Sequence, residues 1–431
     1  MKSRLLFLLC AAAVLLGVAW YSQERELPVS TADFPDLDSV TLCIATDLHV
    51  LAPELMDRGA YFQQVVTNAD GKMTVYSEEL LEAFVHQVIQ ESPEALILSG
   101  DLTFNGEAAS HRYLSEALRE IQSAGIPVFV LPGNHDLNNP MAAQFIGEGW
   151  RPVESITADE FAEIYCDFGY GAALARDDNS LSYTAELASN LRLLVVDVNA
   201  ADPAGTVSAE TLAWVEAQLR DAVEDRAWVI AVSHQDLLAH NSLFTQGFVM
   251  GNANQLLHLY EHYPVICNLS GHIHLQHTAE SAGGVWEIVT SSLAVQPNQY
   301  GVMNLAHRSV SYRTECVDVS SWAAEQGSQD PSLLDFSDTS WQFFRDTGYR
   351  QAIASLGNDT EAVALADFFG TINAAYFAGR MDTAAWDAAL FDGWQAQGGF
   401  LSQYLDSIAD DGFQNHTKLE FPFGGDTDEP Q

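Results

Sequence analysis

Six short apolar runs, each of strand length, alternate along the chain with longer segments that have helical spacing. The apolar runs are residues 40–46, 95–99, 127–131, 191–196, 228–233 and 265–269. The helical segments are residues 78–91, 109–124 and 209–223. Runs of this kind predict buried strands, and their alternation with helices predicts a layered α/β fold.

The rest of the chain divides by its pattern into smaller parts. Residues 286–291 and 310–312, which follow the Gly283-Gly284 turn, predict antiparallel strands that close a first domain. From about residue 318 the pattern becomes helical. We therefore predict a linker (23–38), a large α/β domain (39–317), a small helical C-terminal domain (318–423) and a polar tail (424–431).

Candidate metal ligands occur at or just after the ends of the predicted strands. In chain order they are Asp47, His49, Asp101, Asn134, His234, His272 and His274. Sites in open α/β sheets form at the carboxyl ends of strands. We therefore expect five separate segments to converge on one edge of the sheet structure.

The residue types suit a pair of divalent metal ions. Side chains at positions i and i+2 of an extended segment point the same way, so Asp47 and His49 can reach one ion. Asp101 is the natural bridge between two ions, because a carboxylate has two oxygens. Mixed histidine, aspartate and asparagine ligands favour Mn, Fe, Zn or Co. Two ions about 3.5–4 Å apart can clamp both the attacking and the leaving oxygen of a phosphoryl group.

Each motif taken alone has a structural explanation. Asp-Leu-His is too short to be specific, Gly-Asp after a strand is commonly a turn, and a lone histidine such as His234 is more often structural. The complete set, in this order and always at strand ends, argues against coincidence. Gly100, Gly133 and Gly271 stand beside the ligands and permit tight turns and close backbone approach.

The chain resembles the calcineurin-like metallophosphoesterases in a five-block signature that covers roughly residues 40–313. The blocks are Asp47-x-His49, Gly100-Asp101, Gly133-Asn134-His135-Asp136, His234 and Gly271-His272-x-His274. The resemblance implies a four-layer sandwich of two mixed β-sheets flanked by helices, followed by the small helical domain.

The resemblance also implies a role for each position. The implied ligands are Asp47, His49 and His274 for the first ion, Asn134, His234 and His272 for the second, and Asp101 for both. His135 would donate a proton to the leaving oxygen, and Asp136 would orient His135. Residues 100–107 and 133–140 are similar to a bacterial exported subgroup close to the class III cyclic-nucleotide phosphodiesterases.

The predicted reaction is hydrolysis of phosphate esters, with phosphodiesters favoured. Two neighbouring divalent ions lower the pKa of a bridging water, so that hydroxide attacks phosphorus near neutral pH. A phosphomonoesterase or nucleotidase is the alternative within enzymes. A metal-bound scaffold without catalysis is the alternative outside them, and the presence of all seven ligand positions and His135 argues against it.

Other polar and aromatic residues have two interpretations each. Asn105 and Glu107 line the pocket, or Glu107 and His111 form a surface pair or cap at a helix start. His240 lies near the site or on a distant loop. The aromatic residues of the long connections either cover the substrate or pack the loops; they are Tyr61, Phe62, Trp150 and Tyr165.

The charge of the chain limits its partners. With 18 basic and 59 acidic residues in 431, the net charge is −41. Such a surface repels nucleic acid, so we expect a small phosphate-ester substrate instead. Local cations must overcome the same field for that anion to bind. Nothing in the sequence indicates an oligomeric state.

The N-terminal 22 residues predict a signal peptide or an uncleaved signal anchor. Lys2 and Arg4 precede an apolar run over residues 5–20, with cleavage expected after Ala19 and lipidation at Cys10 as an alternative. We therefore expect an exported protein, either released or attached to the membrane by this segment and facing outside. Outside the cytoplasm a Cys166–Cys316 disulfide is an open alternative.

Overall fold

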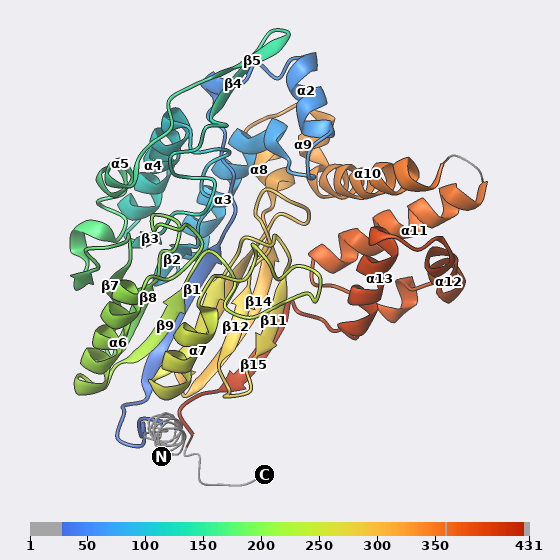
Figure 1. Cartoon of the computed structure of the whole chain (residues 1–431). Coiled ribbons are helices and arrows are strands. Elements are labelled where there is room, and N and C mark those ends of the chain that lie inside the picture. The colour runs from blue at the N-terminus through green and yellow to red at the C-terminus, as the bar shows by residue number, and fades with distance from the viewer. Residues whose placement is uncertain (1–27, 358–359, 426–431) are drawn as a thin grey trace, which may run out of the picture.

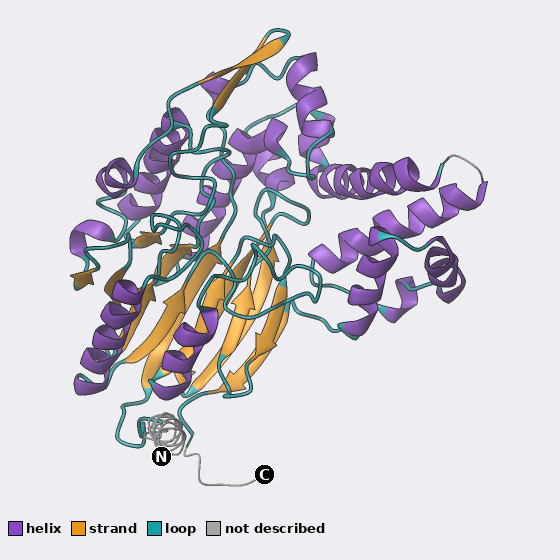
Figure 2. Ribbon diagram, viewed as in Figure 1, coloured by secondary structure: helices purple, strands orange, loops and turns teal. Residues whose placement is uncertain are grey.

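The computed structural model describes residues 28–357 and 360–425. Two mixed β-sheets form its centre, helices cover their outer faces, and a group of helices extends to one side (Figure 1; Figure 2). This architecture confirms the predicted α/β fold with two mixed sheets and a C-terminal helical region. Across residues 28–357 and 360–425, no helix combines the length and the hydropathy needed to cross a bilayer.

The first sheet has six strands in the order β15-β14-β13-β1-β2-β3. They are β1 (Leu37–Ala45), β2 (Ala95–Leu98), β3 (Val128–Val130), β13 (Gln299–His307), β14 (Ser309–Cys316) and β15 (Lys418–Pro422). β1, β2 and β3 are parallel, whereas β13, β14 and β15 add antiparallel pairs on the other side of β1. The carboxyl ends of β1, β2 and β3 therefore lie at one edge.

The second sheet has seven strands in the order β11-β12-β10-β9-β8-β7-β6. They are β6 (Ala175–Arg176), β7 (Tyr183–Ala188), β8 (Leu191–Val195), β9 (Trp228–Val232), β10 (Val265–Ser270), β11 (His277–Glu280) and β12 (Trp286–Val289). β8, β9, β10 and β12 are parallel, and the outer pairs are antiparallel. A separate hairpin, β4 (Ala143–Ile146) and β5 (Gly149–Pro152), extends from the connection after β3.

The helices divide into those that cover the sheets and those that follow them. The first group is α2 (Ala60–Thr67), α3 (Ser77–Glu91), α4 (Ala108–Ser123), α5 (Ala158–Ile164), α6 (Ala209–Glu224) and α7 (Ala253–His262). The second group is α8 (Val319–Glu325), α9 (Pro331–Leu334), α10 (Phe336–Leu356), α11 (Thr360–Phe377), α12 (Ala388–Gln397) and α13 (Phe400–Asp410). Short 3-10 turns are η1 (Pro53–Leu55), η2 (Thr74–Tyr76), η3 (Tyr170–Ala172) and η4 (Thr383–Ala385).

Alternate residues of β9 point into two different cores, which makes its sheet an inner layer. Trp228, Ile230 and Val232 belong to the same core as β1 and β2 of the first sheet. Val229 and Ala231 pack in a second core that includes residues of α6 and α7. Because side chains of a strand alternate between its faces, the layers follow the order helix, sheet, sheet, helix.

The six predicted strands and three predicted helices are confirmed as β1, β2, β3, β8, β9 and β10 and as α3, α4 and α6. Two boundaries differ from the expectation. β1 begins at Leu37, inside the segment predicted as a linker. Residues Lys418–Pro422, inside the segment predicted as helical, form β15 and pair with β14. Neither the early start of β1 nor strand β15 is visible in a local sequence pattern, because the partner strands lie far away along the chain.

The C-terminal helices share a core with the second sheet. Ile273 and Leu275, which follow β10, pack in one apolar cluster with Phe369 of α11 and with Tyr404 and Leu405 of α13. The loop after β10 is therefore held between the sheet and the helical region.

The packing of α10 against α11 depends on Gly348 and Gly370, and we predict that Gly370→Ala destabilises it. An added Cβ at Gly370 would lie 2.5 Å from the carbonyl oxygen of Arg345. We expect the free energy of unfolding to fall by about 1–3 kcal/mol, because the clash outweighs the gain in helix propensity. Chemical denaturation followed by circular dichroism measures this change.

The matched control is Gly149→Ala, because no heavy atom lies within 4 Å of its added Cβ. We expect the control to unfold at nearly the parent midpoint. A Gly370→Ala variant as stable as the parent would contradict the close packing of the two helices.

Candidate metal centre

The seven predicted ligands lie in the loops that follow five parallel strands. Two loops follow β9 and β10 of the second sheet, and three follow β1, β2 and β3 of the first. The structure brings all of the corresponding segments together at one edge of the sandwich, as expected from the strand directions.

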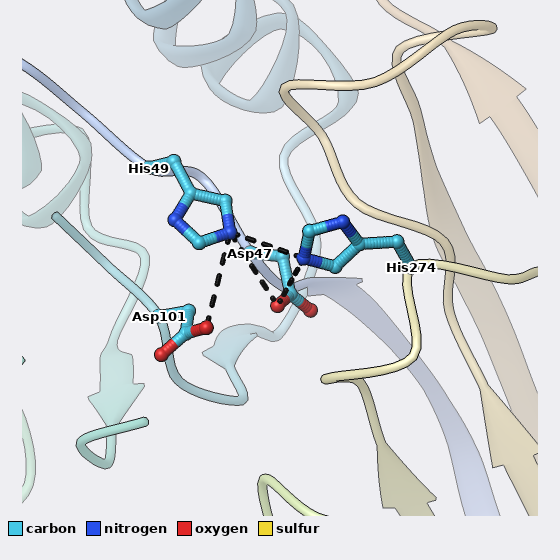
Figure 3. Close-up of side chains that lie close together, drawn as sticks. All are labelled: Asp47, His49, Asp101 and His274. Carbon is cyan, nitrogen blue, oxygen red and sulfur yellow. Dashed lines mark hydrogen bonds and ion pairs between the residues drawn. The ribbon is translucent and has the colours of Figure 1, made fainter. Parts of the chain in front are cut away.

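A first cluster contains Asp47, His49, Asp101 and His274 (Figure 3). One nitrogen or oxygen atom of each lies within 4.8 Å of those of the others. The Nε2 atoms of His49 and His274 are 3.1 Å apart, and His274 Nε2 is 3.2 Å from Asp47 Oδ1. His49 Nε2 is 3.8 Å from Asp101 Oδ2. These atoms face a common point, as ligands of one cation do.

A second cluster contains Asp101, His234 and His272, so Asp101 belongs to both. The Nε2 atom of His234 lies 3.4 Å from Asp101 Oδ1 and 3.2 Å from the amide oxygen of Asn134. Asn134 is exposed, whereas Asp101 and His234 are buried. The second cluster therefore opens toward solvent on the Asn134 side.

Backbone carbonyls select the nitrogen that each histidine presents to the second cluster. His234 Nδ1 is 2.8 Å from the carbonyl oxygen of Ser99, and His272 Nε2 is 2.8 Å from that of Gly247. A carbonyl oxygen accepts only, so these nitrogens carry the protons. The other ring nitrogens, Nε2 of His234 and Nδ1 of His272, are then the ones that can bind a metal ion.

The environment of the two buried aspartates fits cations. Within residues 28–357 and 360–425, the buried Oδ1 atom of Asp47 has ion-pair contacts with the Nε2 atoms of His49 and His274 but no hydrogen bond. Burial opposes ionisation, but the charge of His234 holds the pKa of Asp101 well below its usual range. Although burial disfavours the charged ring, Asp101 raises the pKa of His234 to about 9. Buried carboxylates need a compensating positive charge, which a divalent ion supplies.

The backbone of the site is strained. Five of the ligands have positive φ: Asp47 (51°), His49 (44°), Asp101 (48°), His272 (65°) and His274 (61°). Left-handed backbone at a residue other than glycine costs about 1–3 kcal/mol and is concentrated at functional sites. The loops therefore hold these side chains in place at an energetic cost that packing elsewhere must offset.

The three neighbouring glycines allow this close approach, as predicted. A Cβ at Gly133 would lie 2.2 Å from Asp101 Oδ1, and one at Gly271 would lie 2.6 Å from Asp47 Oδ2. At Gly100 it would lie 2.5 Å from the Nδ1 atom of His234. Any larger residue at these positions would displace a ligand.

His135 lies beside the clusters with its Nε2 atom toward Asp101. Its Nδ1 atom is 3.1 Å from the carbonyl oxygen of Phe104 and 3.0 Å from Oδ1 of Asn105. Both oxygens accept, so Nδ1 carries a proton and Nε2 faces the site, 3.9 Å from Asp101 Oδ2. The side chain is 33% exposed, so a substrate can reach it. Burial lowers the pKa of His135.

The prediction that Asp136 orients His135 is wrong. The Asp136 carboxylate instead accepts hydrogen bonds from the backbone of Leu102, Thr103 and Gly133. It therefore ties together the loops that follow β2 and β3, and the ring of His135 is oriented by Asn105. Burial, together with the charge of Asp101, raises the pKa of Asp136 to about 7.

Glu107 and His111 do not form the surface pair that their spacing allows, because both are buried. His111 contacts the hydroxyl group of Tyr165 and the carbonyl oxygen of Asp136, so it supports the loop of His135. Burial lowers the pKa of His111 to about 3 and raises that of Glu107 to about 7.

The other open interpretations are resolved by position. His240 is buried and contacts Glu287 and His277, neither of which belongs to the two clusters described above. Phe62 and Tyr165 are buried and pack the loops, whereas Trp150 on β5 is 53% exposed. Cys166 and Cys316 are both free and exposed in the described part of the chain, so the alternative of a disulfide is wrong.

One nearby cation was not predicted. Lys72 is buried and forms an ion pair with Asp70, with Nζ and Oδ2 2.6 Å apart. After burial, its charge is the next largest cause of the lowered pKa of His49. A lone lysine in a loop carries no recognisable spacing, so the sequence offered no signal for it.

The metal-centre domain and the C-terminal region each match a family model. Residues 40–276, more than half of the chain, match the model of calcineurin-like phosphoesterases. The chain therefore belongs to the calcineurin-like phosphoesterase family. Residues 318–415 match the model of the C-terminal domain of cyclic nucleotide phosphodiesterase.

Individual relatives are distant and matched only in part. A probable cyclic nucleotide phosphodiesterase of Ruthia magnifica subsp. Calyptogena magnifica is 32% identical over 80 residues, 19% of this chain and 33% of that one. A glycerophosphodiester phosphodiesterase of Enterobacter lignolyticus is 28% identical over 188 residues, 43% of this chain and 58% of that one. A solved dimetal phosphatase of Danio rerio is 16% identical, with a TM-score of 0.49 over 64% of this chain and 95% of that one.

We predict that Asp101→Ala removes both metal ions, because Asp101 is the carboxylate that the two clusters share. Elemental analysis after dialysis measures the number of ions per chain. Asp47→Ala is the comparison, because Asp47 belongs to the first cluster alone and its loss should leave the second ion bound. Retention of both ions by Asp101→Ala would contradict the shared role.

Proposed function

We propose that this protein is a phosphodiesterase that hydrolyses small phosphate diesters with two divalent metal ions. The observation that carries the proposal is the position of Asp101, which is shared by two ligand clusters and lies 3.9 Å from the Nε2 atom of His135. A phosphate bound at both clusters would therefore lie within reach of a proton donor.

The donor sets support two ions of the group Mn, Fe, Zn or Co. The proposed ligands are Asp47, His49 and His274 for the first ion, Asn134, His234 and His272 for the second, and Asp101 for both. When bound, the ions supply positive charge for the phosphate and a hydroxide for attack on phosphorus.

A side chain of the protein supplies the proton, and neighbouring residues fix which ring nitrogen faces the site. His135 presents Nε2 to the site because the carbonyl oxygen of Phe104 and the side chain of Asn105 hold the proton on Nδ1. A protonated Nε2 atom then donates to the oxygen of the departing alcohol. General acid catalysis of this kind contributes about 100–10,000-fold.

Two observations favour diesters over monoesters. The relatives in Ruthia magnifica and Enterobacter lignolyticus are both named as phosphodiesterases. The chain carries a net charge of −41, which repels a doubly charged monoester more strongly than a singly charged diester. A phosphomonoesterase or nucleotidase remains the second candidate, and a metal-bound scaffold the third.

We also propose that the protein is exported, since Lys2, Arg4 and the apolar run at residues 5–20 have the order of an export signal. These residues lie outside the described part of the chain. Cell fractionation should find the protein outside the cytoplasm, and an N-terminus at Trp20 would indicate cleavage of the signal. A full-length chain recovered entirely from the cytoplasm would refute export.

We predict that His135→Ala slows the hydrolysis of esters with poor leaving groups far more than that of esters with good ones. The variant should keep both metal ions and hydrolyse methyl p-nitrophenyl phosphate at close to the parent rate, because nitrophenolate leaves without a proton. On a diester with an alkyl or nucleoside leaving group it should lose about 100–10,000-fold in kcat. Steady-state kinetics on both esters, with metal content measured in parallel, tests this.

Asn105→Ala serves as the positioning variant. It should show a smaller loss with the same dependence on the leaving group, because Phe104 still accepts from His135 Nδ1. Equal losses of His135→Ala on both esters would mean that His135 only positions phosphate. A parent protein inactive on both ester classes with every metal would favour the scaffold.

A further inference from the structure

A pocket of about 440 Å³ lies beside the metal centre, between the second sheet and the C-terminal helices. His272 and His274 line it together with residues of α10, α11 and α13. Its volume is within the range of small-molecule sites, about 300–1,000 Å³. The pocket is therefore large enough for part of a substrate held at the metal centre.

Aromatic side chains from both parts of the molecule form the apolar wall of this pocket. Phe244 and Phe248, in the loop after β9, have ring centroids 5.4 Å apart. The ring centroid of Phe244 also lies 6.3 Å from that of Phe400 and 5.8 Å from that of Tyr404, both on α13. Phe248 lies 5.4 Å from the ring of His272, so the aromatic wall reaches a candidate metal ligand directly.

The aromatic wall continues into a smaller apolar pocket of about 130 Å³. The smaller pocket extends to Leu275 and Tyr376, and the two pockets share Phe244, Phe248, Ile273, Phe377 and Tyr404. None of the described residues lining either pocket is Lys or Arg, and Asp70 is the sole carboxylate among them. A neutral apolar group suits these surroundings, and a second phosphate does not.

A gap left between two packed domains is the simpler explanation. It does not account for Phe400, which is 59% exposed and lies against the aromatic wall. A large exposed aromatic ring beside a pocket gains stability when a ligand covers it. The direct contact of the wall with His272 also places the pocket where a group attached to a bound phosphate would extend.

We propose that this inter-domain pocket binds a neutral aromatic ring on the alcohol that remains attached to phosphorus. The proposal rests on the phosphodiesterase function proposed above. His135 does not line the pocket among its described residues, so the leaving alcohol lies elsewhere. In the reaction, a water oxygen bonds to phosphorus, the bond from phosphorus to the leaving oxygen breaks, and that oxygen takes a proton. The monoester product keeps the ring.

Diesters that share one leaving group test the proposal. Phenyl, hexyl and methyl p-nitrophenyl phosphate all release nitrophenol, so their kcat/KM values differ through the retained group. In Phe400→Ala and Phe244→Ala we expect the phenyl-to-methyl ratio to fall roughly tenfold or more relative to the parent, with the methyl ester little changed. Trp341→Ala on α10, an exposed aromatic residue outside both pockets, is the matched control and should keep the parent ratio.

An unchanged ratio in both phenylalanine variants would overturn the proposal. A hexyl ester affected as strongly as the phenyl ester would overturn the assignment of a ring in favour of an aliphatic chain. If the parent hydrolyses none of the esters, the proposed function fails separately. Calorimetric binding of phenyl phosphate and methyl phosphate to the metal-loaded protein still tests the pocket, and Phe400→Ala should weaken the phenyl compound alone.

Discussion

The carboxylate of Asp101 is the group on which the rest of the site depends. It lies between His49, carried by the first sheet, and His234, carried by the second. One of its oxygens also accepts a hydrogen bond from the backbone nitrogen of His135. A buried carboxylate in this position destabilises the folded protein unless positive charge compensates it. Cations or protonated histidines beside Asp101 supply that charge where the two sheets meet.

The loops around Asp101 are held by hydrogen bonds that buried side chains form. Asp136 accepts from backbone nitrogens of two loops, and the hydroxyl group of Ser292 donates to the carbonyl oxygen of Asp47 at 2.7 Å. These bonds keep left-handed residues in place that would otherwise relax. The site is thus pre-organised by the polypeptide, and the histidine tautomers are set by carbonyls before any ion binds.

The gathering of the candidate ligands could be predicted from the sequence, whereas the contacts that support them could not. The spacing of Asp47 and His49 and the strand-end positions are local signals, so the whole set was recognisable. The resemblance implied that Asp136 orients His135, whereas the ring contacts Asn105, thirty positions earlier. Strand β15 was missed because a short edge strand is defined by its distant partner strand and not by its own sequence pattern.

The C-terminal helices supply none of the predicted ligands, but they reach the metal centre through packing. Ile273 stands between His272 and His274, and its side chain is buried in the core of α11 and α13. A shift of those helices therefore moves the loop that presents two ligands, because close-packed cores transmit displacement. The same contact makes the helices a wall of the pocket beside the metal centre. Ile273 thus links the positions of His272 and His274 to the shape of the pocket. A change in the helical region therefore affects both.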